Sequence, residues 1–143
     1  MKITFIAHSA FLVEWDKFYT LFDYVYEPDY TGTLPPLDPQ KPLLVFSSHS
    51  HEDHFDGKVF GLLEQYPLTQ FFVSRDTRLT ERRRKWLGIS DEAFARTTVL
   101  RPDSILLTEA AGEELSVRAI KSTDIGNAYL LRAEGKMVYH GGD

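Results

Sequence analysis

The feature that most constrains this chain is a short apolar run that leads into a cluster of histidines. Residues 43–48, Leu-Leu-Val-Phe-Ser-Ser, have the continuous hydrophobicity of a strand buried on both faces. The next six residues are His49-Ser50-His51-Glu52-Asp53-His54. Because side chains alternate along a strand, His49 and His51 point to the same side and can converge on one cation. Imidazole and carboxylate groups bind Zn²⁺ and related first-row metals, so this pattern predicts a metal site at the end of a central strand.

The number of candidate ligands in this segment favours a dinuclear centre. His49, His51, Asp53 and His54 exceed what one ion needs from one segment, and two metals about 3.5–4 Å apart use them naturally. The alternative is a polar loop that happens to be rich in histidine, which the density of the cluster behind a buried strand disfavours. Cysteine is absent, which excludes disulfides, thiolate metal sites and cysteine nucleophiles.

Hydrophobic patterning predicts a mixed α/β (α+β) fold. The first three strands suggest an antiparallel meander, the middle of the chain alternates strands with helices, and the last third returns to strands. Five of the seven prolines fall in residues 27–42, which predicts a long loop. Strands are expected at 3–7, 10–14, 18–22, 43–48, 70–74, 97–100, 104–108, 115–120, 128–132 and 137–140, and helices at 58–65 (capped by Asp56), 76–87 and 91–95.

Length and charge set further bounds. A chain of 143 residues is sized for a single domain, and its formal charge of −5 argues against general nucleic-acid binding. A basic cluster could meet phosphates or nucleic acid, although a solvated helix face is the interpretation we favour. No apolar run approaches the length of a membrane span, so we expect no membrane association and a cytoplasmic location. The basic cluster consists of Arg75, Arg78, Arg82, Arg83, Arg84 and Lys85.

Three segments together resemble one known family. The pattern His49-x-His51-x-Asp53-His54 after a hydrophobic strand is similar to the signature of the metallo-β-lactamase fold superfamily. Residues 7–14, Ala-His-Ser-Ala-Phe-Leu-Val-Glu, resemble the "GHSxFLIE" opening of its L-ascorbate-6-phosphate lactonase-like and phospholipase D-like branch. Residues 139–143, Tyr-His-Gly-Gly-Asp, resemble the "YHAGD" strand end of that branch.

The resemblance implies a fold, a metal centre and a reaction. The fold would be an αββα sandwich with mixed sheets and a dinuclear, usually zinc, site at one edge. His49 and His51 would bind the first metal, Asp53 and His54 the second, and Asp143 would bridge both. A hydroxide held between the metals and oriented by Asp53 would attack a small ester, lactone or phosphodiester.

Two departures from the family limit this transfer. The family supplies a third histidine to the first metal from a loop that here reads Ser122-Thr123-Asp124-Ile125-Gly126. Asp124 is the candidate substitute, and it is equally consistent with a turn-forming aspartate before Gly126. A carboxylate ligand would favour Mn²⁺ or Fe²⁺ over Zn²⁺. Complete domains of the family are also longer, so we expect residues 1–143 to be the N-terminal portion of one domain.

Four other residues are weaker candidates for supporting the ligands or touching a small-molecule substrate. His8 and Ser9 fall in a tight turn that the resemblance places near the site, and a purely structural turn is the alternative. Asp23 could orient a ligand histidine or merely cap its strand. His140 is favoured as a core or supporting residue over a ligand. The sequence also allows a degenerate, non-catalytic domain that binds a metal or a partner, and it does not predict an oligomeric state.

Overall fold

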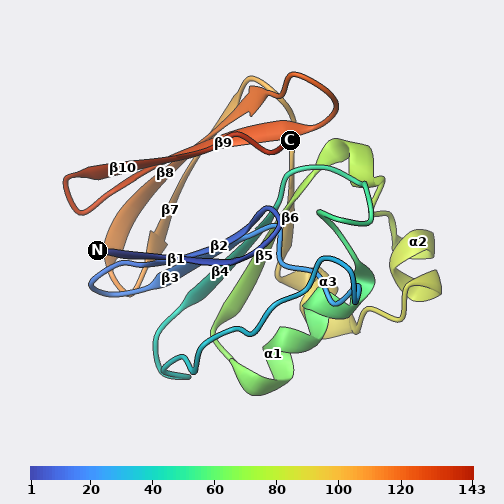
Figure 1. The fold of residues 1–143 in the computed structure, drawn as a ribbon, viewed down its shortest axis with the longest axis horizontal. Helices are drawn as coiled ribbons and strands as arrows, with labels where there is room; N and C mark the ends of the chain where they lie inside the picture. The colour runs from blue at the N-terminus through green and yellow to red at the C-terminus, as the bar shows by residue number, and fades with distance from the viewer.

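Ten strands form two sheets that pack face to face, and three short helices lie on one side of them (Figure 1). The computed structural model describes all residues from Met1 to Asp143. The strands are β1 (Lys2–Ala7), β2 (Ala10–Glu14), β3 (Tyr19–Phe22), β4 (Leu43–Ser47), β5 (Thr69–Ser74), β6 (Thr97–Leu100), β7 (Ser104–Ala110), β8 (Glu113–Lys121), β9 (Asn127–Ala133) and β10 (Lys136–His140). The helices are α1 (Leu62–Gln65), α2 (Glu81–Trp86) and α3 (Asp91–Ala95), with 3₁₀ turns η1 (Gly57–Gly61) and η2 (Arg75–Thr77).

The first sheet is mixed and the second is antiparallel. The six-stranded sheet has the order β1-β2-β3-β4-β5-β6, in which β1, β2 and β3 pair antiparallel and the remaining pairs are parallel. The four-stranded sheet has the order β10-β9-β8-β7. This confirms the predicted meander at the start, the parallel strands in the middle and the return to antiparallel strands at the end.

Strand β4 is buried on both faces, as its continuous hydrophobicity predicted. Leu43 and Val45 belong to the core between the first sheet and the helices, whereas Leu44 and Phe46 belong to the core between the two sheets. Tyr129 of β9 packs on Phe46 with ring centroids 5.1 Å apart, and it ties the second sheet to the first. The mixed α/β sandwich is therefore confirmed, with one core on either side of the first sheet.

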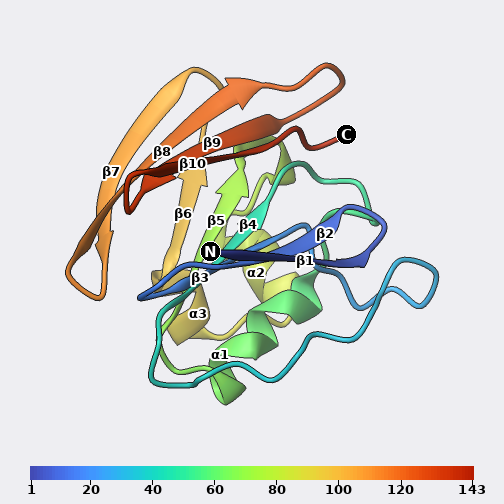
Figure 2. The same cartoon turned by 60° about the vertical axis from the view of Figure 1, so that its left-hand side comes forward.

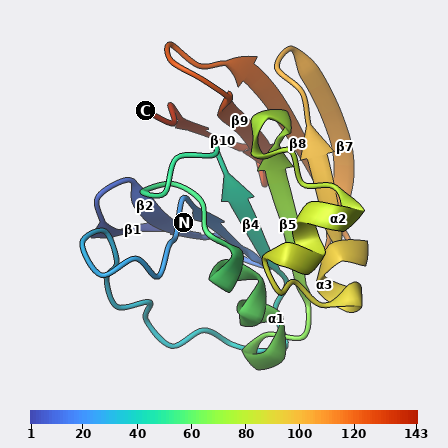
Figure 3. The same ribbon diagram turned by 90° about the vertical axis from the view of Figure 1, so that its right-hand side faces the viewer.

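Helices cover only one of the two outer faces. They all lie on the face of the first sheet that points away from the second (Figure 3). The outer face of the second sheet carries no helix, so the structure contains three of the four layers of an αββα sandwich (Figure 1). On that uncovered face Ile105, Leu107, Met137 and Tyr139 are exposed.

Two helix predictions were wrong in detail. The predicted helix at 76–87 begins only at Glu81, because Arg78 adopts a left-handed backbone conformation (φ 51°) and Thr80 caps the helix through its hydroxyl. The helical segment at 58–65 is divided into η1 and α1, although Asp56 caps it as expected by accepting from two backbone N–H groups. The remaining elements lie within two residues of their predicted bounds, and 23–42 contains no helix or strand.

The topology gathers several loops at one end of the sandwich. The β1–β2 turn, the loop after β4 and the residues after β10 all lie at this end (Figure 2). Carboxyl ends of parallel strands share one edge of a sheet, which is where such folds place their binding sites. None of the helices has the length and hydrophobicity that a membrane-spanning segment needs.

Candidate metal centre

The loop after β4 buries two histidines whose outer ring nitrogens have no partner. His49 and His54 are both fully buried (0% exposed), and their rings lie 4.0 Å apart. Neither Nε2 atom has a hydrogen-bond partner. A buried polar atom normally finds a partner, because leaving it unsatisfied costs about 1–3 kcal/mol. Two such nitrogens side by side are the arrangement expected where a cation is to be bound.

Asp23, at the end of β3, fixes both of these histidines from behind. Its Oδ2 accepts a hydrogen bond from Nδ1 of His54 at 2.7 Å and another from the Ser48 hydroxyl at 2.7 Å. The Ser48 hydroxyl in turn lies 2.9 Å from Nδ1 of His49. The bond to Asp23 makes Nδ1 the protonated nitrogen of His54, so its Nε2 presents a lone pair. Asp23 is 1% exposed and has a left-handed backbone (φ 48°), which aspartate tolerates better than most residues.

Asp143 lies between the two histidines. Its Oδ2 is 4.0 Å from Nε2 of His49, and its Oδ1 is 3.8 Å from Nε2 of His54. One carboxylate oxygen therefore faces each ring.

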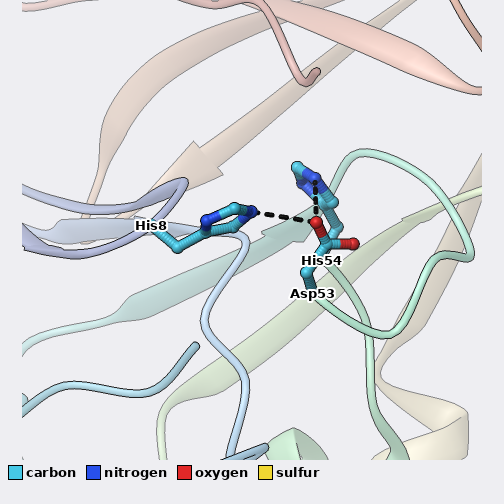
Figure 4. Close-up of side chains that lie close together, drawn as sticks. All are labelled: His8, Asp53 and His54. Carbon is cyan, nitrogen blue, oxygen red and sulfur yellow. Dashed lines mark hydrogen bonds and ion pairs between the residues drawn. The ribbon is translucent and has the colours of Figure 1, made fainter. Parts of the chain in front are cut away.

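Asp53 joins the site from the loop and is held by His8 (Figure 4). Its Oδ2 lies 2.9 Å from Nε2 of His8 and 3.4 Å from Nε2 of His54. His8 stands at the β1–β2 turn with a left-handed backbone (φ 53°), and its ring lies 5.0 Å from the ring of Tyr30 in the long loop. His8, Asp53 and His54 form one group whose ligand atoms lie within 4.8 Å of one another.

His51 and Asp124 complete the cluster on its exposed side. His51, Asp124 and Asp143 each offer a ligand atom within 4.8 Å of the others, and all three are exposed. Two further groups also have ligand atoms within 4.8 Å of one another: His49, His51 and Asp53, and His49, His54 and Asp143. The structure thus brings Asp124 beside His51 and Asp143.

These residues fit the metals that the sequence predicted. The ligand atoms are imidazole nitrogens and carboxylate oxygens only, which suit Zn²⁺, Mn²⁺ and Fe²⁺. The four groups overlap, because each of five residues belongs to two of them: His49, His51, Asp53, His54 and Asp143. The candidate ligands are His49, His51, Asp53, His54, Asp143 and Asp124.

Burial and neighbouring charges shift the pKa values of the two buried histidines in opposite directions. Burial lowers the pKa of His49, and the nearby His54 lowers it further. Burial acts in the same direction on His54, but the hydrogen bond and charge of Asp23 outweigh it and raise the pKa of His54. His49 is therefore held neutral, the form in which an imidazole binds a metal.

Asp53 is stabilised as a carboxylate. Its partial burial would raise the pKa, but the hydrogen bond from His8 and the charge of His54 together lower it below its usual value. A carboxylate that stays ionised can serve as a ligand or as a hydrogen-bond acceptor for a nucleophile.

His140 and Ser9 support the site without facing it. The ring of His140 stacks on Phe22 at 4.8 Å, and its Nε2 donates to the backbone carbonyl of Ser9 at 3.0 Å. Its Nδ1 accepts from the Gly142 N–H at 3.3 Å. His140 therefore links the turn that carries His8 to the segment that carries Asp143, and Ser9 takes part through its carbonyl.

Several residues of the site were not singled out from the sequence. The Ser48 hydroxyl contacts both the Asp23 carboxylate and Nδ1 of His49. Asp76 accepts a hydrogen bond from the Ser50 N–H at 2.9 Å. Gly126 adopts φ +79°, and a Cβ there would lie 2.3 Å from the Ser48 carbonyl oxygen. Gly126 could be predicted as a turn residue because it precedes a strand. Its close approach to Ser48 could not, because it depends on the packing of two loops.

The fold and the arrangement of histidines define the class of the protein. A mixed sheet packed on an antiparallel sheet, with a His-x-His-x-Asp-His segment at the end of β4, is the metallo-β-lactamase fold, and solved structures of that class match this chain. Igni18, a metallo hydrolase from the hyperthermophilic archaeon Ignicoccus hospitalis, superposes with a TM-score of 0.65 at 22% identity, covering 99% of this chain and 60% of its own. A B3 metallo-β-lactamase with an active-site glutamic acid superposes with a TM-score of 0.53 at 16% identity, covering 94% of this chain and 56% of its own.

A curated relative is similar along the whole chain. A UPF0173 metal-dependent hydrolase of Opitutus terrae is 29% identical to it, over 100% of this chain and 63% of the relative. This chain therefore spans less than two thirds of the length of that relative. No protein-family profile matches the chain. The metallo-β-lactamase fold is thus confirmed, whereas the L-ascorbate-6-phosphate lactonase-like branch stays a prediction.

Proposed function

We propose that this protein is a metal-dependent hydrolase whose centre is formed by His49, His51, Asp53, His54 and Asp143. The observation that carries the proposal is the pair of buried, unpartnered Nε2 atoms of His49 and His54, held by Asp23 from behind. The relatives support it: one is a metal-dependent hydrolase and another a metallo hydrolase.

The chemistry proposed is hydrolysis at a dinuclear zinc centre. When bound, two zinc ions supply Lewis-acid activation of water to hydroxide near neutral pH. The chain's own residues would hold these ions: His49 and His51 would serve the first metal position, Asp53 and His54 the second, and Asp143 would contribute to both. Asp53, whose pKa is lowered by His8, would orient the attacking water through its carboxylate. A small ester, lactone or phosphodiester is the substrate class proposed.

Asp124 bears on both the metal and the alternative function. Its carboxylate stands beside His51 and Asp143. A relative with this fold is a metallo-β-lactamase with an active-site glutamic acid, which supports a carboxylate at such a site. We propose Asp124 as the third ligand of the first metal, with Mn²⁺ or Fe²⁺ as the alternative metals. If the carboxylate fails to bind, a non-catalytic metal- or partner-binding domain is the second candidate.

Hydrolysis of a substrate panel tests the proposal. Purified protein supplied with Zn²⁺, Mn²⁺ or Fe²⁺ is assayed on carboxylic esters, lactones and bis-aryl phosphodiesters, beside His51→Ala. His51 is exposed, so its removal leaves the core intact. We expect turnover of at least one class, lost in His51→Ala. Metal binding without turnover on any class would contradict the hydrolase and favour the second candidate.

Substrate size and cellular location complete the proposal. We propose that the protein acts on a small molecule and resides in the cytoplasm.

A further inference from the structure

A polar hollow lies beside the loop that follows β4 and carries candidate ligands (residues 48–54, the ligand loop). It has a volume of about 770 Å³ and opens where β5 ends and η2 begins. Ser50, which lies between His49 and His51 in the sequence, lines it together with Gly126 from the loop before β9. Its charged lining consists of Arg75, Asp76, Arg78 and Arg83.

The hollow contains three buried polar atoms that lack a hydrogen-bond partner. They are the Ser74 hydroxyl, Oδ1 of Asp76 and Nε of Arg83. Ser74 is 1% exposed, so its hydroxyl has no access to bulk water. Outside the metal centre, this is the place in the chain where unsatisfied buried groups gather. Groups of this kind call for a bound partner, because each costs about 1–3 kcal/mol when left alone.

The arginines of the hollow also lack acidic partners. No carboxylate oxygen lies within 4.0 Å of the guanidinium groups of Arg75, Arg78 or Arg83. Arg84, on the same helix as Arg83, contacts both Glu81 and Asp91. The chain thus neutralises the buried arginine beside the hollow but leaves the three that line it available.

The backbone around the hollow is held in an unusual conformation. Arg78 has a left-handed backbone (φ 51°), which interrupts the helical stretch and separates η2 from α2. Asp76 is fixed by accepting the Ser50 N–H at 2.9 Å. Residues in sparsely populated backbone regions cluster at ligand-binding segments, since the cost of the conformation persists only where the surroundings enforce it.

We propose that this hollow binds a phosphoryl group. Three guanidinium groups and a buried hydroxyl offer more donors than the two oxygens of a carboxylate can use, whereas a phosphate has enough oxygens to accept them all. The unpartnered Oδ1 of Asp76 is an acceptor, and it is satisfied by a phosphoryl oxygen that carries a proton. The site is distinct from the metal centre, and the inference does not depend on the proposed function.

Calorimetric titration of the full chain with inorganic phosphate tests this inference. Arg75→Gln and Arg78→Gln remove exposed guanidinium groups that line the hollow, so they leave the core intact. Arg82→Gln is the matched control, because Arg82 is exposed on the same helix as Arg83 but does not line the hollow. We expect each lining variant to weaken phosphate binding about tenfold, Arg82→Gln to stay within twofold, and Ser74→Ala to weaken it severalfold. Circular dichroism confirms that each variant is folded.

Four outcomes would overturn the inference. The first is the absence of phosphate saturation at millimolar concentrations, and the second is acetate binding as tightly as phosphate. The third is a loss of phosphate affinity in Arg82→Gln as large as in the lining variants, or binding of single-stranded RNA that Arg82→Gln weakens as much as they do. Either result would indicate a diffuse basic face. The fourth is loss of phosphate binding in His51→Ala without loss in Arg75→Gln, which would place the phosphate at the metal centre.

Discussion

Asp23 accepts a hydrogen bond from Nδ1 of His54 at 2.7 Å, and both side chains are buried. The same carboxylate also reaches His49 through the Ser48 hydroxyl. One residue at the end of β3 therefore fixes two rings of the loop after β4, and it directs both Nε2 atoms toward Asp143. Partners of this kind set the tautomer and the orientation of metal-binding histidines.

Replacing Asp23 with asparagine should weaken metal binding. The new side chain would have the same size, but it would present an NH₂ group to one of the donors that Asp23 now accepts from, and the negative charge would be lost. We expect the affinity for Zn²⁺ to fall about 10–100-fold, as measured by competition with a chromogenic chelator. Asp16→Asn is the matched control, because Asp16 is exposed. Wild-type affinity in folded Asp23→Asn would contradict this role.

Replacing His8 with alanine should have a smaller effect. His8 donates one hydrogen bond to Asp53, and the pair is partly exposed. A single hydrogen bond contributes about 0.5–1.5 kcal/mol, so we expect a two- to tenfold loss of metal affinity. Ser9→Ala is the control, since Ser9 contributes its backbone carbonyl. Complete loss of binding in His8→Ala would instead make His8 an essential ligand, and unchanged affinity would remove it from the site.

Replacing Gly126 with alanine should disrupt the ligand loop. A Cβ at this position would lie 2.3 Å from the Ser48 carbonyl oxygen and 2.6 Å from Cβ of His49. Gly135→Ala is a close control, because Gly135 has φ +71° but no atom within 4 Å of its Cβ position. We expect Gly135→Ala to cost about 1 kcal/mol of unfolding free energy from backbone strain alone. Gly126→Ala should cost clearly more in urea unfolding and should also reduce metal binding; equal costs would show that the loops separate without penalty.

Metal should stabilise the fold through this site. A ligand that binds only the native state adds about 2.7 kcal/mol at a concentration of 100 times its Kd. We expect Zn²⁺ to raise the melting temperature of the wild type by several degrees, and EDTA to reverse the effect. His51→Ala should show a smaller rise while its melting temperature in EDTA stays close to that of the wild type. A rise in His51→Ala equal to that of the wild type would mean that the metal stabilises the chain elsewhere.

The sequence predicted all ten strands because their signals are local. The apolar run of β4 predicted a strand buried on both faces. The His-rich segment after it predicted the position of the candidate site. The break at Arg78 could not be predicted, because the pattern of residues 76–87 is helical. The break lies at Arg78, whose backbone is left-handed, and Asp76 just before it accepts a hydrogen bond from the Ser50 N–H of the loop after β4.

The supporting residues were harder to predict than the ligands. Asp23 was a candidate because it ends its strand. The role of Ser48 was not predicted, because its contact with Asp23 depends on the pairing of β3 with β4. His140 was predicted as a core or supporting residue, and it stacks on Phe22 while it braces Ser9. Contacts of this kind join residues far apart in the chain, so no local sequence pattern predicts them.

The metal content of the purified protein tests the central claim most directly. Elemental analysis by mass spectrometry is made after equilibration with Zn²⁺ and gel filtration, on the wild type and on His51→Ala. We expect about two zinc ions per chain in the wild type, as a dinuclear centre requires, and a clear loss in His51→Ala. A wild-type chain that retains no metal above the buffer level, or a His51→Ala variant that retains as much as the wild type, would contradict the proposed metal centre.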